Sequence, residues 1–341
     1  MNNLVSISTE DYMYAMQQRN LVYNCNFIYF SNQKIVGNTI EYGIPDGWIY
    51  NGNKSDGSLD FDTTQNQLII KKGASKDEVT LKQALDEFPR GKSTLLGKTI
   101  TAKFFITTDT EGDVTFSISD GADSSTKVRA EKGTNTISVQ HQVSQNTTKV
   151  YLSIKTSTPN MTIRINKIVA NIGLVALENL PCIVEGVIGQ RKQYIATETS
   201  PIGELSLCKE PMELSENYTR LDSVINGRFG RGAGGRSFLI DMRGYFSRAW
   251  NNGSTIDPDA SKRTAPNSGT ITGDHVSTFE EDIFLKHDHG LNYDMNTIIA
   301  TGDKGAAMTV NKTANSKTNP TSEGKETRPK NIAELYTIKW A

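Results

Sequence analysis

The chain has 341 residues, more than one hydrophobic core usually serves, so we expect two compact domains and a short appendage. Its 37 basic and 38 acidic side chains give a formal net charge of −1, which excludes a global field that attracts nucleic acid. No apolar run approaches the ~18 residues of a membrane span and the first residues do not resemble a leader, so we expect synthesis in the cytoplasm without membrane insertion.

The three cysteines are Cys25, Cys182 and Cys208. They are widely spaced and odd in number, a pattern that fits neither a disulfide framework nor a paired Cys-x-x-Cys metal site. We interpret them as small buried hydrophobic residues.

Residues 8–19 are predicted to form a helix. Ser8 or Thr9 can cap its N-terminus, and Glu10 and Asp11 then lie in the positive first turn. An isolated helix of about 12 residues is marginal in water without a partner. Residues 1–19 are therefore expected to attach the chain to a larger structure, or else to lie on the chain's own domain.

Residues 20–173 are predicted to form a β-sandwich. Apolar residues alternate with polar ones in 114–118, 150–154 and 161–165, as in strands that bury one face. Clusters of Gly, Asp, Asn and Pro separate these stretches at the spacing of a sandwich or jelly roll. The expected fold class is all-β.

Three stretches of this region resemble the jelly-roll modules of the galactose-binding-like class: Asn20–Phe27, Pro45–Trp48 and Ile163–Ile168. The resemblance implies a carbohydrate-binding or spacer module. Trp48 and Tyr50 are candidates for a flat platform that stacks on a sugar ring. The alternative is that Trp48, which follows a glycine turn, packs in the core.

Residues 174–203 are expected to form a connector, because their apolar residues are too sparse for an independent core. Pairing with copies of itself would stabilise such a segment, as in an intertwined stalk.

A glycine-rich loop follows in the C-terminal third. Gly230, Gly232 and Gly235 satisfy G-x-G-x-x-G, but no strand precedes the loop and no helix follows it, so nucleotide binding is not expected. Asp241 and Arg243, just beyond, are predicted to form a partly buried ion pair that orders the loop.

His287 and His289 are candidate metal ligands. On an extended strand, residues i and i+2 project to the same face. Two ligands are too few for a closed site, but three copies around a three-fold axis would supply six nitrogens, which suits an octahedral divalent ion such as ferrous iron. The alternative is a solvent-exposed pair in a polar turn.

Several motifs occur in a fixed order toward the end of the chain: Asp241–Trp250, Asp257–Asp259 with Arg263, Gly273–Asp274, His287–His289 and Glu326–Asn331. This ordered set is similar to the tail-collar domain of phage tail fibres, with a collar like that of the T-even short tail fibre. The resemblance covers residues 204–341. It implies an intertwined homotrimeric collar or knob at the end of a receptor-binding fibre.

The resemblance also implies partners and a site. His287 and His289 of three chains would hold one divalent transition-metal ion, iron or zinc, on the three-fold axis. The N-terminus would bind baseplate or tail proteins, and the fibre would belong to a virion tail or an extracellular phage-like particle. A tip at residues 290–325 would meet bacterial surface polysaccharide or lipopolysaccharide, with the receptor-binding candidates Asn311, Lys312, Asn315, Lys317 and Asn319.

No catalytic constellation is recognisable, so we expect an adhesin and not an enzyme. The carboxylates at Asp257 and Asp259 and at Glu280–Asp282 are typical of solvated turns, and neither G-x-S-x-G nor H-E-x-x-H is present. Two alternatives remain: a secreted glycan-active enzyme with an accessory binding module, and a structural spacer fibre without a receptor site.

Overall fold

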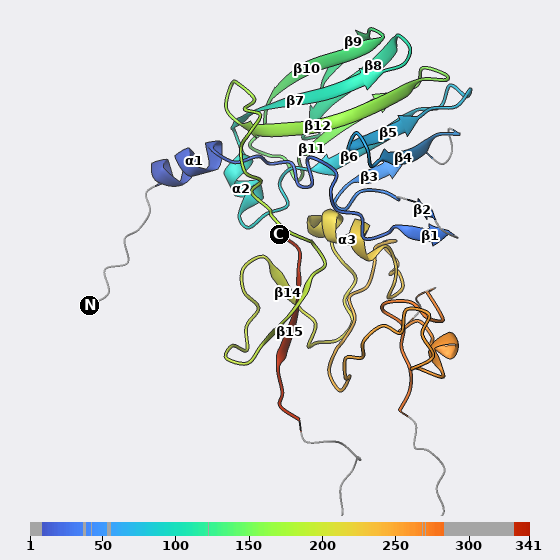
Figure 1. Ribbon diagram of the computed structural model, residues 1–341. Coiled ribbons are helices and arrows are strands. Elements are labelled where there is room, and N and C mark those ends of the chain that lie inside the picture. The colour runs from blue at the N-terminus through green and yellow to red at the C-terminus, as the bar shows by residue number, and fades with distance from the viewer. Residues whose placement is uncertain are drawn as a thin grey trace, which may run out of the picture. The chain divides into compact units, whose positions relative to one another are not determined.

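A computed structural model describes residues 9–36, 39–41, 43–52, 56–121, 123–267, 269, 271–282 and 331–341. The chain divides into two compact units, one made of Met1–Phe279 with Glu334–Ala341 and the other of Glu280–Ala333. Only residues 280–282 and 331–333 of the second unit are described. The first unit is mostly β-sheet (Figure 1).

Two five-stranded antiparallel sheets form a β-sandwich, as predicted for residues 20–173. The first sheet has the order β10 (Gly133–Gln142), β7 (Thr99–Thr108), β12 (Thr162–Ile172), β5 (Gln67–Lys71) and β4 (Ser58–Asp62). The second has the order β3 (Ile49–Asn51), β6 (Val79–Ala84), β11 (Tyr151–Thr156), β8 (Gly112–Ser119) and β9 (Asp123–Ala130). Most connections from β5 to β12 pass from one sheet to the other, which is the connectivity of a jelly-roll-like fold.

Alternation of inward and outward side chains builds the sandwich core in most strands, and a register shift between Ile165 and Lys167 interrupts it in β12. In β8 the residues Val114, Phe116 and Ile118 are buried, whereas their polar neighbours face outward. Phe104 of β7 meets Phe116 across the two sheets, with ring centroids 4.8 Å apart. The apolar pattern that predicted the strands therefore also fixes which face of each sheet is buried.

The turn before β3 directs an aromatic side chain into this core. Gly47 has φ +82°, and a Cβ at this position would lie 2.5 Å from the Tyr23 ring, so both backbone conformation and space require glycine. The next residue, Trp48, is 0% exposed and its ring lies 5.5 Å from that of Phe27.

Short helices lie at the margins of the sandwich. Helix α1 (Thr9–Gln17) falls inside the predicted range 8–19 and contacts β12, with Met16 buried. The Tyr12 hydroxyl lies 3.1 Å from the Thr94 hydroxyl of α2 (Gly91–Leu95). The helix thus lies on the chain's own sandwich, while Tyr14 is 68% exposed. Within the described part of the chain, no helix is long and apolar enough to cross a bilayer.

The rest of the first unit has little regular structure. A two-stranded ribbon joins β1 (Lys34–Val36) to β2 (Thr39–Glu41). A three-stranded sheet has β15 (Leu335–Lys339) between β13 (Arg191–Tyr194) and β14 (Glu204–Ser206). The described residues between β14 and Phe279 contain the helix α3 (Thr219–Ile225) and the single 3-10 turns η1 (Glu216–Tyr218) and η2 (Ala260–Lys262).

A buried carboxylate fastens α3 to the sandwich. Glu87, in the loop after β6, accepts hydrogen bonds from the backbone N–H groups of Thr219 and Arg220, each at 2.7 Å, and pairs with Lys149 at 2.7 Å. The Arg220 guanidinium is fully buried and donates to the carbonyl oxygens of Ala84, Glu87 and Leu21. Residues to Phe279 therefore share one compact unit with the sandwich, instead of forming a separate domain from residue 204.

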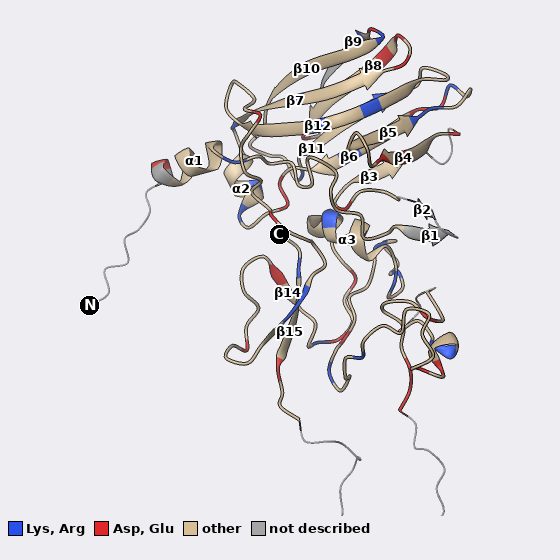
Figure 2. Ribbon diagram, viewed as in Figure 1, with Lys and Arg blue, Asp and Glu red and all other residues tan. Residues whose placement is uncertain are grey.

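Charged residues of both signs are interspersed over the strands and loops (Figure 2). No region of the described ribbon is dominated by one sign in this view.

Candidate functional site

The predicted sugar platform of Trp48 and Tyr50 is not formed. Trp48 is enclosed in the core and cannot stack on a ligand. Tyr50 pairs in register with Leu81 of β6, which places it on the inner face of the sheet. Its hydroxyl is buried without a hydrogen-bond partner among the described residues, and burial raises the pKa of Tyr50 to about 12. Trp48 and Tyr50 are two residues apart in extended backbone and therefore share one face. The turn at Gly47 directs that face into the core.

The outer face of β6, β11 and β8 presents an aromatic ring in a polar setting. Tyr151 is half-buried there, and the Lys82 ammonium lies 4.9 Å from its ring centroid. Ser117 and Ser153, on the same face, share a hydrogen bond of 2.7 Å. Burial, with smaller contributions from Glu87 and Asp86, raises the pKa of Tyr151 to about 12, so the phenol stays a neutral donor at physiological pH. We call Tyr151, Lys82, Ser117 and Ser153 the tyrosine face.

Two members of the tyrosine face, Tyr151 and Lys82, are partly exposed, whereas Ser117 and Ser153 are buried beneath them at 4% and 6% exposure. An aromatic ring packs against the apolar side of a pyranose, and the Tyr151 hydroxyl and the Lys82 ammonium are the groups that can hydrogen-bond to its hydroxyls. In the alternating stretch Val150–Ile154, Leu152 points into the core, so the side chain of its neighbour Tyr151 points to the outer face. The sequence therefore carries this signal, because Tyr151 stands between two buried apolar residues of an alternating stretch.

The motif residues of the C-terminal third order a loop region, residues 241–276. The predicted ion pair between Asp241 and Arg243 is confirmed, with 2.6 Å between Oδ2 and Nη2. This hydrogen bond lowers the pKa of Asp241 below its ordinary value. Asp257 is buried and pairs with Arg263 at 3.0 Å and with Arg248 at 3.3 Å.

Asp274 connects the end of the loop region 241–276 to residues 250–253 by hydrogen bonds. Its carboxylate accepts hydrogen bonds from the Gly253 N–H at 2.6 Å and from Asn251 at 3.2 Å, and its carbonyl oxygen accepts one from the Trp250 indole at 3.2 Å. The Gly253 hydrogen bond is the main cause of a lowered pKa for Asp274. Asp241 and Asp274 are thus ionised at neutral pH, which suits them to ordering loops and not to donating protons.

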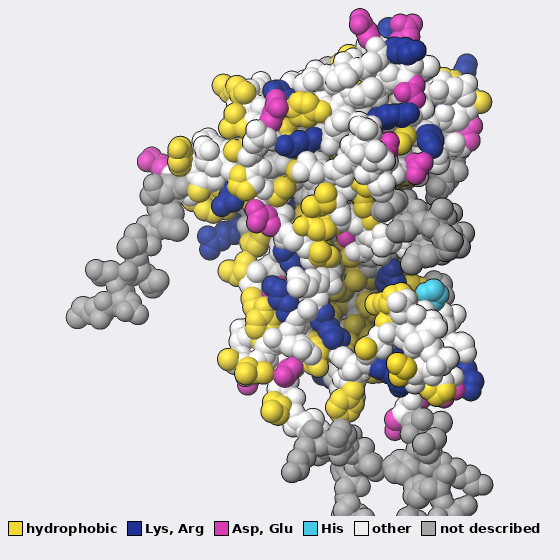
Figure 3. All heavy atoms as spheres, viewed as in Figure 1, with side chains coloured by type: hydrophobic (Ala, Val, Ile, Leu, Met, Phe, Trp, Pro, Cys, Tyr) yellow, Lys and Arg dark blue, Asp and Glu magenta, His cyan; other side chains and the backbone are white. Residues whose placement is uncertain are grey.

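Large apolar side chains remain exposed on this ordered loop region. They are Tyr245, Phe246, Trp250, Ile256 and Val276, and we call them the exposed apolar set. Phe246 is 68% exposed and Ile256 is 85% exposed. Hydrophobic side chains are also visible on the surface around β14 and β15 (Figure 3). Exposed apolar groups mark an interaction surface where they form a contiguous patch, so this set is a candidate for such a surface.

The remaining predicted site residues lie outside the described residues. These are the metal candidates His287 and His289, the receptor-binding candidates Asn311, Lys312, Asn315, Lys317 and Asn319, and the whole predicted tip at 290–325. Within the described ranges, no group of three or more His, Cys, Asp or Glu side chains could hold a metal ion.

No protein-family model matches the chain. Protein RhiB of Rhizobium leguminosarum bv. viciae is 33% identical over 129 residues, which cover 36% of this chain and 58% of RhiB. The chain therefore spans a little over half the length of this curated relative.

Solved structures similar to the chain cover less than half of it. A CBM4 structure is 15% identical, with a TM-score of 0.33 over 45% of this chain and 99% of that one. TmCBM61 in complex with beta-1,4-galactotriose is 14% identical, with a TM-score of 0.33 over 46% and 99%. The enzymatically active domain of bacteriophage CBA120 tailspike protein 4 is 10% identical, with a TM-score of 0.32 over 45% and 21%.

Proposed function

We propose that this chain is a non-enzymatic adhesin, a homotrimeric receptor-binding fibre of a phage tail or phage-like particle that recognises bacterial surface glycan. The observation that carries the proposal is the exposed apolar set on a loop region ordered by the motif residues that resemble a tail collar. The N-terminal segment would attach to baseplate or tail proteins, and the sandwich and the tip would meet the glycan.

Trimer formation would bury the exposed apolar set. The loop region between β14 and Phe279 has few backbone hydrogen bonds in regular elements, and its fold depends on ion pairs and side-chain contacts to backbone. The connector adds Ile195 and Ile202, which are 81% and 85% exposed. Aliphatic groups at such exposure gain little from sugar contacts but bury well against two further copies of the chain.

We also propose that His287 and His289 of the three chains hold one divalent transition-metal ion. The trimer and the ion are tested together, by absolute mass from light scattering and by metal content on the same sample. A trimer with one transition-metal ion per three chains is expected. His287→Ala with His289→Ala should lose the ion and lower the melting temperature, because an ion that binds only the folded state stabilises it. A metal-free monomer at micromolar concentration would contradict both the collar and the ion.

Glycan binding by the sandwich is assigned to the tyrosine face. Tyr151→Ala should lose binding to an array of bacterial surface polysaccharides, because the stacking ring is removed. The matched control is Phe105→Ala, a half-buried ring on the outer face of β7 in the opposite sheet. Equal losses in the two variants, or no loss in either, would remove the tyrosine face from the proposal.

The tip is tested separately by deleting residues 290–325. Loss of adsorption to host cells with the trimer intact supports a receptor site there, whereas unchanged adsorption would exclude the tip as the receptor site. Unchanged adsorption after Tyr151→Ala is added to the deletion would support a spacer fibre. New reducing ends released from purified capsule by the unaltered protein would overturn the non-enzymatic assignment.

A further inference from the structure

Two cysteines that lie far apart in the sequence are neighbours in the fold. The Cys25 and Cys182 Sγ atoms are 3.8 Å apart across a sequence separation of 157 residues. Cys25 follows α1 in the turn that begins the sandwich, and Cys182 lies in the connector. The expectation of three isolated, buried thiols is therefore corrected for this pair.

Backbone hydrogen bonds hold the two segments together. The Asn20 N–H donates to the Pro181 carbonyl at 2.8 Å, and the Ile183 N–H donates to the Asn20 carbonyl at 2.9 Å. The Cys25 carbonyl accepts from the Ile168 N–H at 3.2 Å. The segments that carry the two cysteines are thus held side by side, with the sulfur atoms 3.8 Å apart against the ~2.05 Å of a disulfide bond.

The electrostatics favour one thiolate. Cys182 donates a hydrogen bond to Cys25, and the Lys167 ammonium adds positive potential, so the pKa of Cys25 falls to about 7. The same interaction, together with burial, raises the pKa of Cys182. Cys25 is therefore the more readily ionised member of the pair, and a thiolate is the species that attacks a disulfide.

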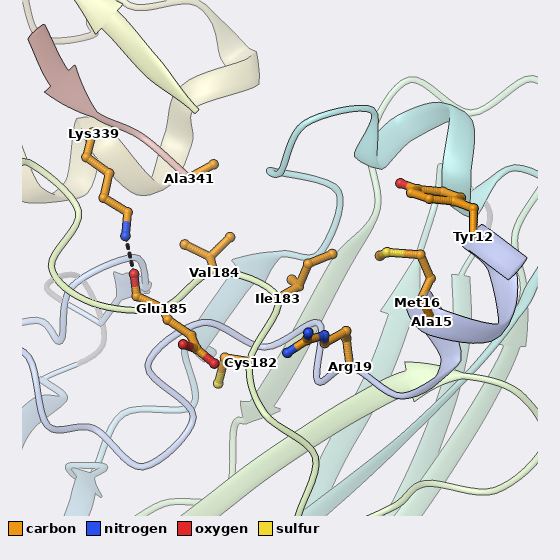
Figure 4. Close-up of a pocket in the computed structure, with 10 residues that line it drawn as sticks. All are labelled: Tyr12, Ala15, Met16, Arg19, Cys182, Ile183, Val184, Glu185, Lys339 and Ala341. Atoms are coloured by element: carbon orange, nitrogen blue, oxygen red, sulfur yellow. Dashed lines mark hydrogen bonds between the residues drawn. The ribbon is translucent and has the colours of Figure 1, made fainter. Parts of the chain in front are cut away.

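A pocket gives access to the pair. Cys182 lines a pocket of about 480 Å³ between α1, the connector and the end of β15 (Figure 4). Met16 and Ile183 contribute apolar wall, and Arg19, Glu185 and Lys339 contribute charged groups. Cys25 is only 7% exposed, so a small reagent meets Cys182 first.

We propose that Cys25 and Cys182 are a thiol–disulfide exchange site, which a low-molecular-weight disulfide such as oxidised glutathione converts into a reversible cross-link between the start of the sandwich and the connector. A proton passes from Cys182 to Cys25 along their Sγ–Sγ contact, and the Cys182 thiolate so formed attacks the reagent, whose S–S bond breaks to release one thiolate. The released thiolate takes the proton from Cys25. The Cys25 thiolate then attacks the Cys182 Sγ, which forms the protein disulfide and releases the second reagent thiolate, so that two electrons pass from the two cysteines to the reagent.

The cross-link closes a long loop and so restricts the unfolded chain. Loop-closure entropy over this separation predicts a rise in melting temperature of about 5–10 °C in the oxidised form. Reduction should reverse the rise.

The test is incubation of the folded protein with excess oxidised glutathione, followed by thiol counting in denaturant and peptide mapping by mass spectrometry. We expect free thiols to fall from three per chain to one, with a peptide that joins Cys25 to Cys182. Cys208→Ser is the matched control, because Cys208 has a similar exposure but its Sγ contacts backbone groups of Glu334 and Tyr336.

Cys208→Ser should still form the cross-link and gain thermal stability, whereas Cys182→Ser should show neither change. Three remaining thiols in the unaltered protein would overturn the proposal. So would a persistent glutathione adduct on Cys182, or a disulfide that joins Cys208 or two chains.

Discussion

Glu87→Gln should lower the free energy of unfolding by about 3–5 kcal/mol, because it removes one partner of a buried charge network. The Glu87 carboxylate is 2% exposed and accepts the N–H groups of Thr219 and Arg220 as well as the Lys149 ammonium. A glutamine keeps the shape but offers one acceptor oxygen in place of two. At least one buried N–H is then left unpaired, at a cost of about 1–3 kcal/mol, and Lys149 keeps only the more distant Asp86, at 3.9 Å, as a charged partner.

The assay is urea denaturation followed by tryptophan fluorescence, with the midpoint and slope of each transition compared. Glu111→Gln is the control, because Glu111 forms a 2.6 Å ion pair with Arg129 in which both side chains are more than 60% exposed. Its midpoint should not move. Trypsin should also cleave Glu87→Gln faster between Arg228 and Arg236, as α3 loosens from the sandwich. A loss below about 1 kcal/mol would show that Glu87 does not hold the C-terminal region, and would refute the reasoning.

Three further outcomes are expected. Trp48→Ala should cost about 3–5 kcal/mol of stability by opening a core cavity, while glycan binding per folded molecule stays unchanged; a selective loss of binding would restore Trp48 as a ligand contact. Asp241→Asn should speed hydrogen exchange near Arg243 at pH 7. Because the folded pKa of Asp241 is depressed, this difference should disappear as the pH falls through that value, and its persistence in acid would exclude the ion pair as the cause. Phe246→Ser with Trp250→Ser should shift light-scattering mass from trimer toward monomer, unlike the exposed helix control Tyr14→Ser, and equal effects would contradict the assigned interface.

Local patterns predicted much of the first unit. Alternation located β8, β11 and β12, and capping residues located α1, because both signals depend on neighbours within a few residues. The Asp241–Arg243 pair was equally accessible, since its members are two residues apart. Two of the stretches singled out in the sequence, Asp241–Trp250 and Gly273–Asp274, meet where the Trp250 indole donates to the Asp274 carbonyl, although the sequence did not reveal which side chains would remain exposed.

The sequence by itself determined that this chain makes a β-sandwich preceded by one short helix, because strand periodicity, turn chemistry and helix capping are encoded locally. Only the tertiary structure decided that Trp48 is enclosed in the core and that Cys25 meets Cys182. Those outcomes depend on pairing register and on contacts between segments more than 60 residues apart, as in the bonds from Glu87 to α3. Such contacts form when the whole core closes, so no short stretch of sequence specifies them.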